Sequence, residues 1–397
     1  MTDILKNKPD YPHDESPGAG EKILVTGASG FLGQQIIKVM LEKYPGARLV
    51  VMLREKKGLS IPERLRAMVD RVAAPENRAD ALARIRVFSS DDISDERCGL
   101  SAEDYRAAAR GLTRVIHSAA TVRFDHPLDH ARRVNVEGTR NVLELAEEAM
   151  KNGDLKSFTY IGTAFVAGER EGLAREDELD EGQSFRNTYE QTKCEAEKLV
   201  RSRMKDIPTI IARPSIIVGD SRTGATTSFK TLYWPLKIYA KYGWRTVPGY
   251  PDAVIDLAPV DYVAEAVVEL SLNTKAIGRC FHLCAGAKRG STLGGIAEAA
   301  ARFFSLKPPR FVNPNLFYRL ISPLLHIALW GKRRRILRDG AAYRPYFRVR
   351  TVFDTTNSEE ILSPRGIEAP AVPMYLEKLF SFCRDTDWGT LPPAERS

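Results

Sequence analysis

The sequence predicts an α/β protein built on a doubly wound parallel sheet, followed by a smaller, mostly helical region. Short apolar runs recur along the N-terminal half of the chain, which is typical of strands buried within a parallel sheet. Segments in which apolar residues recur at helical spacing separate these runs. A glycine-rich turn joins the first run to the first helical segment, as expected of a strand–turn–helix unit.

The expected strands and helices alternate along the chain. Strands are expected at residues 22–26, 49–53, 84–88, 114–118, 157–162 and 209–213, and a further strand at 280–284. Helices are expected at residues 31–43, 134–150, 189–205 and 260–270, the last with Asp261 as its N-cap. This alternation predicts a Rossmann-type sheet with helices on both faces.

The chain is expected to divide into three parts. Residues 1–20 contain much proline, glycine and charge but no apolar signal-peptide core, so they are predicted to form a mobile leader. The sheet domain is predicted at residues 21–220, with return segments at about 250–285. Residues 221–250 and 286–397 are expected to form the substrate-binding region.

The composition and net charge of the chain limit the classes of molecule that are expected to bind it. The chain has 397 residues, 43% of them hydrophobic, and a formal net charge of +8, which favours anionic partners. It has no recognisable nucleic-acid-binding motif, so nucleic acid is not an expected partner. Five irregularly spaced cysteines are expected to be reduced thiols in a cytoplasmic compartment. Cys280, His282 and Cys284 alternate along one expected strand but have no fourth ligand nearby, so no metal site is predicted.

The glycine-rich turn is V-T-G-A-S-G-F-L-G, residues 25–33. Gly27 permits a tight turn, Gly30 lets backbone amides approach a pyrophosphate, and Gly33 allows close packing of the helix. The helix N-terminus then favours the anion. A purely structural turn is the alternative, because the spacing differs from the commoner G-x-G-x-x-G. The context predicts dinucleotide binding by Thr26, Gly27, Ser29, Gly30, Phe31, Leu32 and Gly33.

Arg54 stands at the end of the second expected strand, where an NAD-selective site carries an acid. A guanidinium suits a 2′-phosphate, so NADP(H) is the predicted cofactor; a solvated basic loop is the alternative. Asp92 and Ile93 follow the third strand, where an adenine ring would lie. Ala119 and Ala120 follow the fourth, and their small side chains would let the backbone pass close to the cofactor.

Tyr189 and Lys193 form a Y-x-x-x-K motif, so they lie one turn apart on one helical face. Carbonyl reduction needs a proton donor beside the hydride. The neighbouring ammonium is expected to lower the tyrosine pKa from ~10 toward working pH. Lys193 is also expected to hold the nicotinamide ribose, and Thr163, at the end of the fifth strand, to hydrogen-bond the substrate carbonyl. A surface Tyr–Lys pair is the alternative for the motif taken alone.

These motifs together resemble the extended short-chain dehydrogenase/reductases, and more closely their fatty acyl-CoA reductase and thioester reductase branch, the male sterility type. The resemblance spans roughly residues 22–225. Beside the glycine-rich turn, it rests on H-S-A-A-T-V-R-F, V-N-V-E-G-T-R-N-V-L, Y-I-G-T-A-F-V-A-G-E-R, Y-E-Q-T-K-C-E-A-E and A-R-P-S-I-I-V-G-D-S-R-T-G. It implies Thr163, Tyr189 and Lys193 as the catalytic triad.

The same resemblance implies further positions. Arg54 and the three glycines would contact the dinucleotide, and Pro214 and Ser215 would lie near the nicotinamide. Asn135 would support a catalytic water. Gly162 departs from the family pattern, which usually has serine there.

The leading functional hypothesis is NADPH-dependent reduction of a fatty acyl thioester, carried on CoA or a carrier protein, to the aldehyde; a second cycle could give the alcohol, and the sequence leaves open whether it occurs. Tyr189 and Thr163 would stabilise the oxyanion, and Lys193 would support Tyr189. The alternatives are a sugar-nucleotide epimerase or a sterol- or ketone-type dehydrogenase on the same fold. A non-catalytic, cofactor-sensing protein is a further alternative, against which the intact triad argues.

Residues 316–330 are apolar and aromatic and are followed at once by the basic run 332–335. The apolar part is too short to span a bilayer. It is expected to form either a lid over the acyl pocket or a helix lying among lipid headgroups, and both can hold if the lid faces lipid. The expected location is therefore cytoplasmic, with peripheral membrane contact through 316–335.

Overall fold

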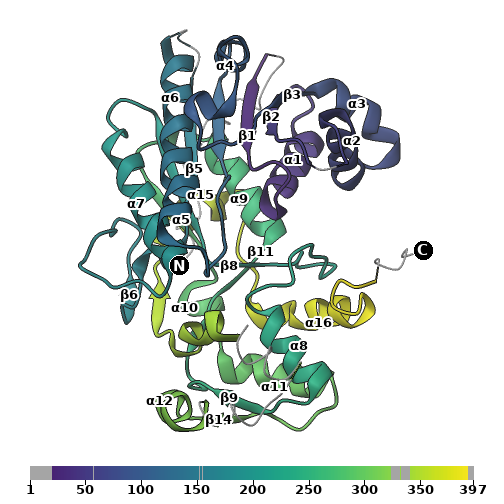
Figure 1. Ribbon diagram of the computed structural model, residues 1–397, viewed down its shortest axis with the longest axis vertical. Helices are drawn as coiled ribbons and strands as arrows, with labels where there is room; N and C mark the ends of the chain where they lie inside the picture. The colour runs from purple at the N-terminus through teal and green to yellow at the C-terminus, as the bar shows by residue number, and fades with distance from the viewer. Residues whose placement is uncertain are drawn as a thin grey trace, which may run out of the picture.

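The computed structural model describes residues 20–391 apart from Lys57, Asn152, Asp154 and the segments 323–330 and 332–339. The predicted leader, but for Gly20, therefore lies outside the described residues. A parallel sheet with helices on both sides forms the upper body of the molecule in Figure 1, and a smaller lobe of helices and short strands lies below it.

The central sheet has seven strands in the order β12-β7-β5-β4-β1-β2-β3, and every pairing is parallel. Its strands are β1 (Lys22–Thr26), β2 (Arg48–Leu53), β3 (Ile85–Ser89), β4 (Arg114–His117), β5 (Ser157–Ile161), β7 (Thr209–Pro214) and β12 (Cys280–Leu283). These strands confirm the predicted Rossmann-type sheet, with small shifts at the strand ends. The strand order reverses between β1 and β4, and ligands of such sheets bind at the carboxyl ends of the strands there.

Helices cover both faces of the sheet. They are α1 (Phe31–Lys43), α2 (Ile61–Val72), α3 (Arg78–Arg84), α4 (Ala102–Ala109), α5 (Leu128–Arg132), α6 (Gly138–Lys151), α7 (Thr188–Ser202), α9 (Val260–Leu272) and α15 (Thr356–Leu362). One apolar core contains Ile36 of α1 and Val267 of α9, and a second contains Val142 of α6 and Val200 of α7. A sheet buried on both faces explains why its strands are almost uniformly apolar.

Two local details differ from expectation. The helix expected at 134–150 begins with a π-helical turn, Arg133–Glu137, between α5 and α6. The prediction of Asp261 as N-cap was wrong, because β11 (Leu257–Pro259) runs directly into α9 and leaves Pro259 at the cap. Asp261 lies in the first turn instead, where its carboxylate accepts hydrogen bonds from Ser221 N at 2.9 Å and Ser221 Oγ at 2.6 Å.

The lower lobe packs three helices around its own core. These helices are α8 (Tyr233–Tyr242), α11 (Leu293–Phe303) and α16 (Leu376–Asp385), and they contribute Leu236, Ala300 and Phe380. The shorter elements are β8 (Ile216–Val218), β9 (Thr246–Pro248), β10 (Val254–Ile255), α10 (Gly286–Arg289), β13 (Ser291–Thr292), β14 (Arg310–Val312), α12 (Pro314–Leu316) and η7 (Gly340–Arg348). The lobe therefore combines residues 216–255 and 376–385 with the described residues among 286–348.

The chain then returns to the sheet domain. Strand β15 (Thr351–Phe353) pairs in parallel with β6 (Gly172–Ala174). The buried carboxylate of Glu176 accepts hydrogen bonds from His282 N at 2.7 Å, Asn357 N at 2.5 Å and Ser358 Oγ at 2.9 Å. This packing adds residues 351–369 to the predicted return segments; the division of the chain into domains otherwise stays a prediction.

Several large buried polar groups of the sheet domain are paired with one another. Arg213, fully buried, makes two hydrogen bonds to Glu197, at 2.6 and 2.9 Å. The His282 ring bonds to Arg213 Nη1 at 3.2 Å and to Asp354 O at 2.8 Å, so both of its nitrogens are engaged by protein groups. All five cysteines are buried and unbonded to one another. Among the residues with a described placement, no cluster of acids, histidines and cysteines could hold a metal, and no helix is both long and apolar enough to cross a bilayer.

Candidate functional site

The glycine-rich turn lies between β1 and α1, where the strand order reverses. Gly27 has a positive φ of 69°, and a Cβ on it would come within 2.8 Å of Ala119 N. A Cβ on Gly33 would come within 2.2 Å of Gly27 O, so this position also requires glycine. Gly30 N donates to Gly27 O at 2.8 Å and closes the turn. The result is a tight backbone cradle, in which the protein's own backbone leaves no room for a side chain at Gly27 or Gly33, and this geometry fits the pyrophosphate of a dinucleotide.

Thr26 supports this cradle from behind. Its hydroxyl bonds with His117 Nδ1 at 2.7 Å and accepts from Ser118 N and Ala119 N, each at 3.2 Å. These bonds tie the loop after β4, which contains Ala119 and Ala120, to the end of β1. The side chain of Thr26 is fully buried, so a cofactor contact here would use its backbone.

Arg54 follows β2 and Asp92 follows β3, and the two side chains lie close enough at this edge of the site to interact electrostatically. Arg54 is exposed. Burial acts to raise the pKa of Asp92, but hydrogen bonds from Ser94 and the positive charges of Arg133 and Arg54 outweigh it and lower the pKa. Ile93, the next residue, has its carbonyl fixed by Asn141 Nδ2 at 3.0 Å. The predicted 2′-phosphate and adenine positions are therefore neighbours.

The predicted catalytic side chains lie together at the carboxyl end of β5. Tyr189 lies at the start of α7 and is hydrogen-bonded to the Thr163 hydroxyl. Lys193, one turn further along α7, donates from Nζ to Ile161 O at 2.7 Å, and its Nζ lies 4.2 Å from the centre of the Tyr160 ring. Thr163 also donates to Pro214 O at 3.4 Å, which places Pro214 beside the triad.

Burial sets the protonation of this group. It lowers the pKa of Lys193 to about 7, against the opposing charge of Glu197. It also raises the pKa of Tyr189 to about 12, against the hydrogen bond to Thr163. The expectation that Lys193 lowers the tyrosine pKa was therefore wrong for this structure, because loss of solvent dominates. A tyrosine with this pKa is protonated near neutral pH and can donate its proton.

Asn135 joins two parts of the site. It lies buried in the π-helical turn, accepts from Thr121 N at 2.8 Å, and donates to Thr192 Oγ1 at 2.9 Å. It thereby ties the loop after β4 to α7, one residue from Lys193. Turns of this kind recur at functional sites. Its support of a catalytic water stays a prediction.

Gly162 and Ser215, two positions near the triad that were singled out in the sequence, are closely packed against neighbouring strands and side chains. A Cβ at Gly162 would lie 3.2 Å from Arg213 Cγ and 3.3 Å from Glu197 Oε2, so a serine there would press against this buried ion pair. Ser215 is buried and directly follows β7. Its backbone amide donates to Leu283 O at 3.3 Å, so it extends the pairing of β7 with β12 beside the site.

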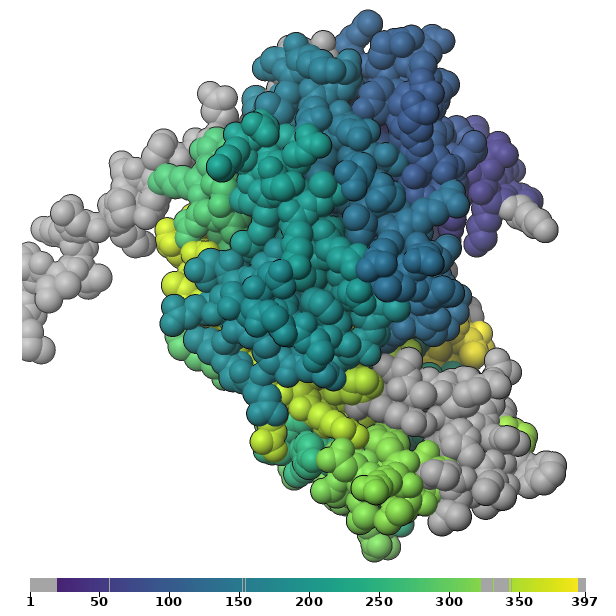
Figure 2. Space-filling view, turned by 60° about the vertical axis from the view of Figure 1, so that its left-hand side comes forward, coloured from purple at the N-terminus to yellow at the C-terminus, as the bar shows by residue number. Residues whose placement is uncertain are grey.

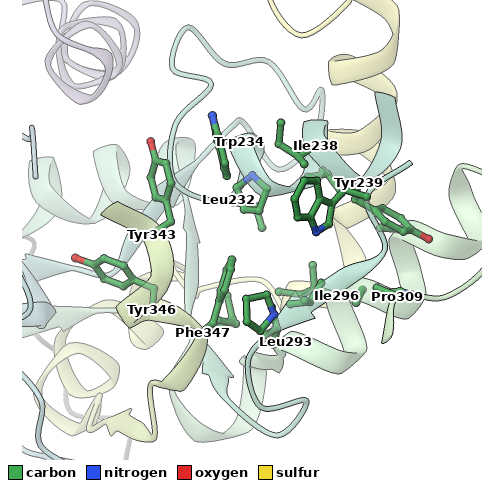
Figure 3. Close-up of a pocket in the computed structure, with 18 of the residues that line it drawn as sticks. Leu232, Trp234, Ile238, Tyr239, Leu293, Ile296, Pro309, Tyr343, Tyr346 and Phe347 are labelled. Carbon is green, nitrogen blue, oxygen red and sulfur yellow. The ribbon is translucent and has the colours of Figure 1, made fainter. Parts of the chain in front are cut away.

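An apolar cavity of about 180 Å³ lies in the lower lobe, between α8, α11, β9 and η7. Figure 3 shows Tyr343 and Tyr346 at one end and Tyr239 and Pro309 at the other. Trp234 and Ile238 of α8 line one wall, and Leu293 and Ile296 of α11 line the facing wall (Figure 3). Such a cavity suits an apolar chain rather than a polar ligand.

Aromatic rings connect this cavity to Tyr189, the predicted catalytic tyrosine. The Phe124 ring lies 5.9 Å from the Tyr189 ring and 5.4 Å from the Tyr346 ring, centre to centre. Tyr346 lines the cavity, and its hydroxyl bonds to Glu190 Oε1 at 2.8 Å and Asn187 Nδ2 at 2.9 Å. The cavity and the start of α7 therefore share a wall.

No motif in the sequence predicted a role for Phe124, Glu190 or Tyr346. Phe124 and Glu190 lie inside segments that carried the family resemblance, but the catalytic and cofactor motifs include only their neighbours. Nothing local marks Tyr346, because its partner Glu190 lies 156 residues earlier in the chain.

The segment 316–335 is described only at 316–322 and at Gly331, so its basic run lies outside the described residues. Phe317 and Tyr318 line the apolar cavity, as expected of a lid. Leu316, Leu320 and Ile321 are exposed by 56%, 55% and 40%. The predicted membrane contact stays a prediction.

Comparison with known proteins is consistent with this geometry. The family described as male sterility protein, an NAD-binding family, matches residues 25–267, more than half of the chain. The chain is 28% identical over 290 residues to a fatty acyl-CoA reductase of Drosophila melanogaster, a match that covers 64% of the chain and 55% of the fly protein. It is 27% identical over 290 residues to a nonribosomal peptide synthetase of Aspergillus flavus, a match that covers 70% of the chain and 27% of the synthetase.

A solved structure is similar over nearly its whole length. The terminal R domain from the myxalamid PKS-NRPS biosynthetic pathway is 27% identical, with a TM-score of 0.79 over 94% of this chain and 93% of that domain. The chain spans about half the length of the fly reductase and about a quarter of the fungal synthetase. It belongs to the male sterility protein family, in the fatty acyl-CoA reductase and thioester reductase branch of the extended short-chain dehydrogenase/reductases.

Proposed function

We propose that this protein uses NADPH to reduce a fatty acyl thioester, bound to CoA or to a carrier protein, to the aldehyde and then the alcohol. The observation that carries the proposal is the wall shared by the apolar cavity and the start of α7, formed by Tyr346. A long acyl chain in this cavity would end beside Tyr189. A sugar nucleotide would leave its hydroxyl groups without partners among these apolar side chains.

The reduced nicotinamide supplies a hydride to the thioester carbonyl carbon. The chain's own groups act on the carbonyl oxygen. Thr163 and Tyr189, already hydrogen-bonded to each other, can both donate to that oxygen as its negative charge develops. Tyr189 then gives up its phenolic proton, and Lys193, positioned by Ile161 O, stabilises the tyrosinate. Expulsion of the thiol releases the aldehyde.

NADP(H) is the proposed cofactor because an exposed arginine, Arg54, occupies the rim of the cradle at the end of β2. A guanidinium pairs with a phosphate through two parallel hydrogen bonds. NADH offers a hydroxyl at this position and would gain much less. The glycine cradle itself serves both dinucleotides equally.

The decisive experiment presents the purified protein with NADPH or NADH and a substrate panel. The panel contains long-chain acyl-CoA, the same chain on a carrier protein, the fatty aldehyde, a sugar nucleotide and a sterol ketone. We expect NADPH oxidation that depends on the acyl thioester, with aldehyde or alcohol identified by mass spectrometry. Turnover of the sugar nucleotide or the ketone, with inert thioesters, would contradict the proposal.

A cytoplasmic enzyme that docks peripherally on membranes through residues 316–335 is part of the same proposal. The exposed Leu316, Leu320 and Ile321 support it, because apolar side chains on a short helix can enter the headgroup region. Co-sedimentation with anionic and neutral vesicles tests it. Absence of binding to anionic vesicles at low salt leaves only the lid.

A further inference from the structure

A second cavity, of about 440 Å³, lies beside η7 and is lined by charged side chains. We define the arginine cleft by four of its residues, Arg170, Arg186, Arg348 and Arg350. Two acids, Glu169 and Glu171, also line it, so the charged lining carries two more positive than negative groups. A cleft with this excess attracts anions.

Two of the four arginines are paired within the protein. Arg170 lies 2.8 Å from Glu178 Oε2, and Arg186 lies 3.4 Å from Glu190 Oε2. Both ion pairs fix the walls of the cleft. Arg348 and Arg350 are therefore the two arginines whose N–H donors are most available to a ligand in the cleft.

Arg350 is only loosely held. Its guanidinium is 3.6 Å from Asp252 Oδ2, and its side chain is 47% exposed. It also lies over the ring of Tyr250, 5.3 Å from the ring centre. This stacking orients the planar group without using its N–H donors.

Arg348 is the clearest indication of a ligand. Its Nε is buried and has no hydrogen-bond partner in the part of the chain that the structure describes. Its guanidinium lies 5.6 Å from the centre of the Tyr318 ring, which orients it but accepts no conventional hydrogen bond. A buried donor without an acceptor is costly. An anion in the cleft would remove that cost.

The arginine cleft adjoins the proposed active site. The single segment η7 lines both cavities: Tyr343, Tyr346 and Phe347 line the apolar cavity, and Pro345 and Arg348 line the cleft. Tyr318 also lines both. Figure 2 shows the segment around residue 350 at the surface, between the sheet domain and the lower lobe. Arg186 connects the cleft to α7, because it pairs with Glu190, next to Tyr189.

We propose that the arginine cleft binds the phosphate of the phosphopantetheine arm that carries the thioester. This inference rests on the proposed function. The acyl chain would occupy the apolar cavity, the thioester would lie at Tyr189, and the arm would leave along η7 toward Arg348 and Arg350. Guanidinium groups are suited to this ligand, since their fork of donors matches two phosphate oxygens. CoA and carrier proteins share this phosphate.

The test compares three thioesters with the same acyl chain: acyl-CoA, acyl-4′-phosphopantetheine and acyl-pantetheine, which has no phosphate. Arg348→Gln and Arg350→Gln should each raise the KM for acyl-CoA by about 10-fold, with little change in kcat. The KM for acyl-pantetheine should stay the same. Arg348→Lys should restore part of the loss. Arg106→Gln, an exposed arginine of α4 that lines neither cavity, is the matched control.

The pattern of KM increases shows whether the cleft binds the phosphate that CoA and carrier proteins share or the nucleotide phosphates of CoA. Equal losses for acyl-CoA and acyl-4′-phosphopantetheine assign the cleft to the phosphate that both carriers share. A loss confined to acyl-CoA would overturn the proposal, because it would assign the cleft to the nucleotide phosphates of CoA. Unchanged KM values, or equal increases for all three substrates, would overturn the proposal.

Failure of the proposed function would be visible separately. If the unmodified protein reduces none of the three thioesters, titration with CoA in the presence of saturating NADPH tests the cleft directly by calorimetry. Affinity that falls in Arg348→Gln and Arg350→Gln supports the cleft, and affinity that is unchanged in both overturns it. Arg350 is half-exposed, so its variant remains informative if Arg348→Gln lowers stability.

Discussion

Tyr346 donates a hydrogen bond of 2.8 Å to Glu190 Oε1 and so joins the wall of the apolar cavity to the residue that follows Tyr189, the proposed proton donor. Glu190 is fully buried, and burial raises its pKa, while its contacts with Arg186 and Tyr346 act in the opposite direction. Glu190 is thus held by one partner from its own neighbourhood, Arg186, and by one from the lower lobe, Tyr346. We therefore expect the orientation of Tyr189 to depend on how the lower lobe packs against α7.

Tyr346→Phe should lower both stability and kcat. The ring would keep its contacts with Phe124 and Phe165, but Glu190 Oε1 would lose its donor, at a cost of about 1–3 kcal/mol in unfolding free energy. We expect kcat to fall several-fold because α7 shifts. Tyr239→Phe is the control, since that tyrosine lines the same cavity but donates to Lys307 O. Equal kcat values for both variants would refute a positioning role for Tyr346.

Arg54→Glu should reverse or abolish the preference for NADPH. The substitution replaces a phosphate-binding cation with an anion, which repels a 2′-phosphate and can accept hydrogen bonds from a ribose hydroxyl. We expect the ratio of kcat/KM for NADPH to that for NADH to fall by at least about 10-fold. Competitive titration of both cofactors checks it. Equal affinities in the unmodified protein would remove Arg54 from the cofactor site.

Tyr189→Phe should reduce the rate on the order of 10²-fold or more while cofactor affinity stays nearly the same. The ring contact with Phe124 survives, and only the hydroxyl shared with Thr163 is lost. Lys193→Ala should impair both cofactor binding and rate. Single-turnover kinetics with NADPH separates the two effects. Parental turnover by Tyr189→Phe would exclude it as the proton donor.

Lys193→Met should stabilise the cofactor-free protein most strongly at acidic pH. Burial lowers the lysine pKa from 10.5 to about 7, so both states are charged below pH 7 and the folded state bears the full burial cost. Between about 7 and 10.5 the unfolded chain retains a proton that the folded chain has released, so stability rises with pH. The advantage of the variant should shrink across that window.

Thermal unfolding of the cofactor-free protein at about pH 6 and about pH 9 measures this difference. Lys198→Met, on the same helix but 46% exposed and paired with Asp180, is the control and should show no such pH-dependent advantage. A constant difference between Lys193→Met and the unmodified protein would mean that Lys193 keeps its proton in the fold from about pH 6 to about pH 9, so that burial does not lower its pKa.

Ala297→Trp should shorten the preferred acyl chain. Ala297 lies on α11 and lines the apolar cavity, so an indole there would fill part of its volume. We expect the KM for long-chain thioesters to rise at least several-fold, with little change for short ones, because each excluded CH₂ forfeits ~0.8 kcal/mol. Glu298→Trp places the same side chain on the exposed face of the helix. A uniform effect on all chain lengths would place the acyl chain elsewhere.

The sheet and the cofactor turn were predictable because their causes are local. A strand buried on both faces must be apolar, and a turn that brings Gly33 within van der Waals distance of Gly27 O requires glycine. The pairing of Tyr189 with Lys193 follows from helical spacing alone. These constraints act over a few residues, so they appear directly in the sequence.

The rest of the site arises from contacts between distant segments. The cavity needs α8, α11 and η7 together, and no short pattern specifies that they meet. The tyrosine pKa depends on burial that only the assembled fold creates, which is why the local Tyr–Lys argument predicted the wrong direction. Asp261 was misassigned because its hydrogen bonds to Ser221, 40 residues away, replace a capping role.

The carboxylate of Glu176 also has a consequence for biosynthesis. Two of its hydrogen-bond donors, Asn357 and Ser358, are translated about 180 residues later. Strand β6 likewise lacks its partner strand until β15 has been synthesised. At typical elongation rates this delay is on the order of ten seconds, during which a nascent chain holds an incompletely satisfied acid beside an open strand edge. The N-terminal domain therefore cannot complete its packing until residues 351–358 have been synthesised.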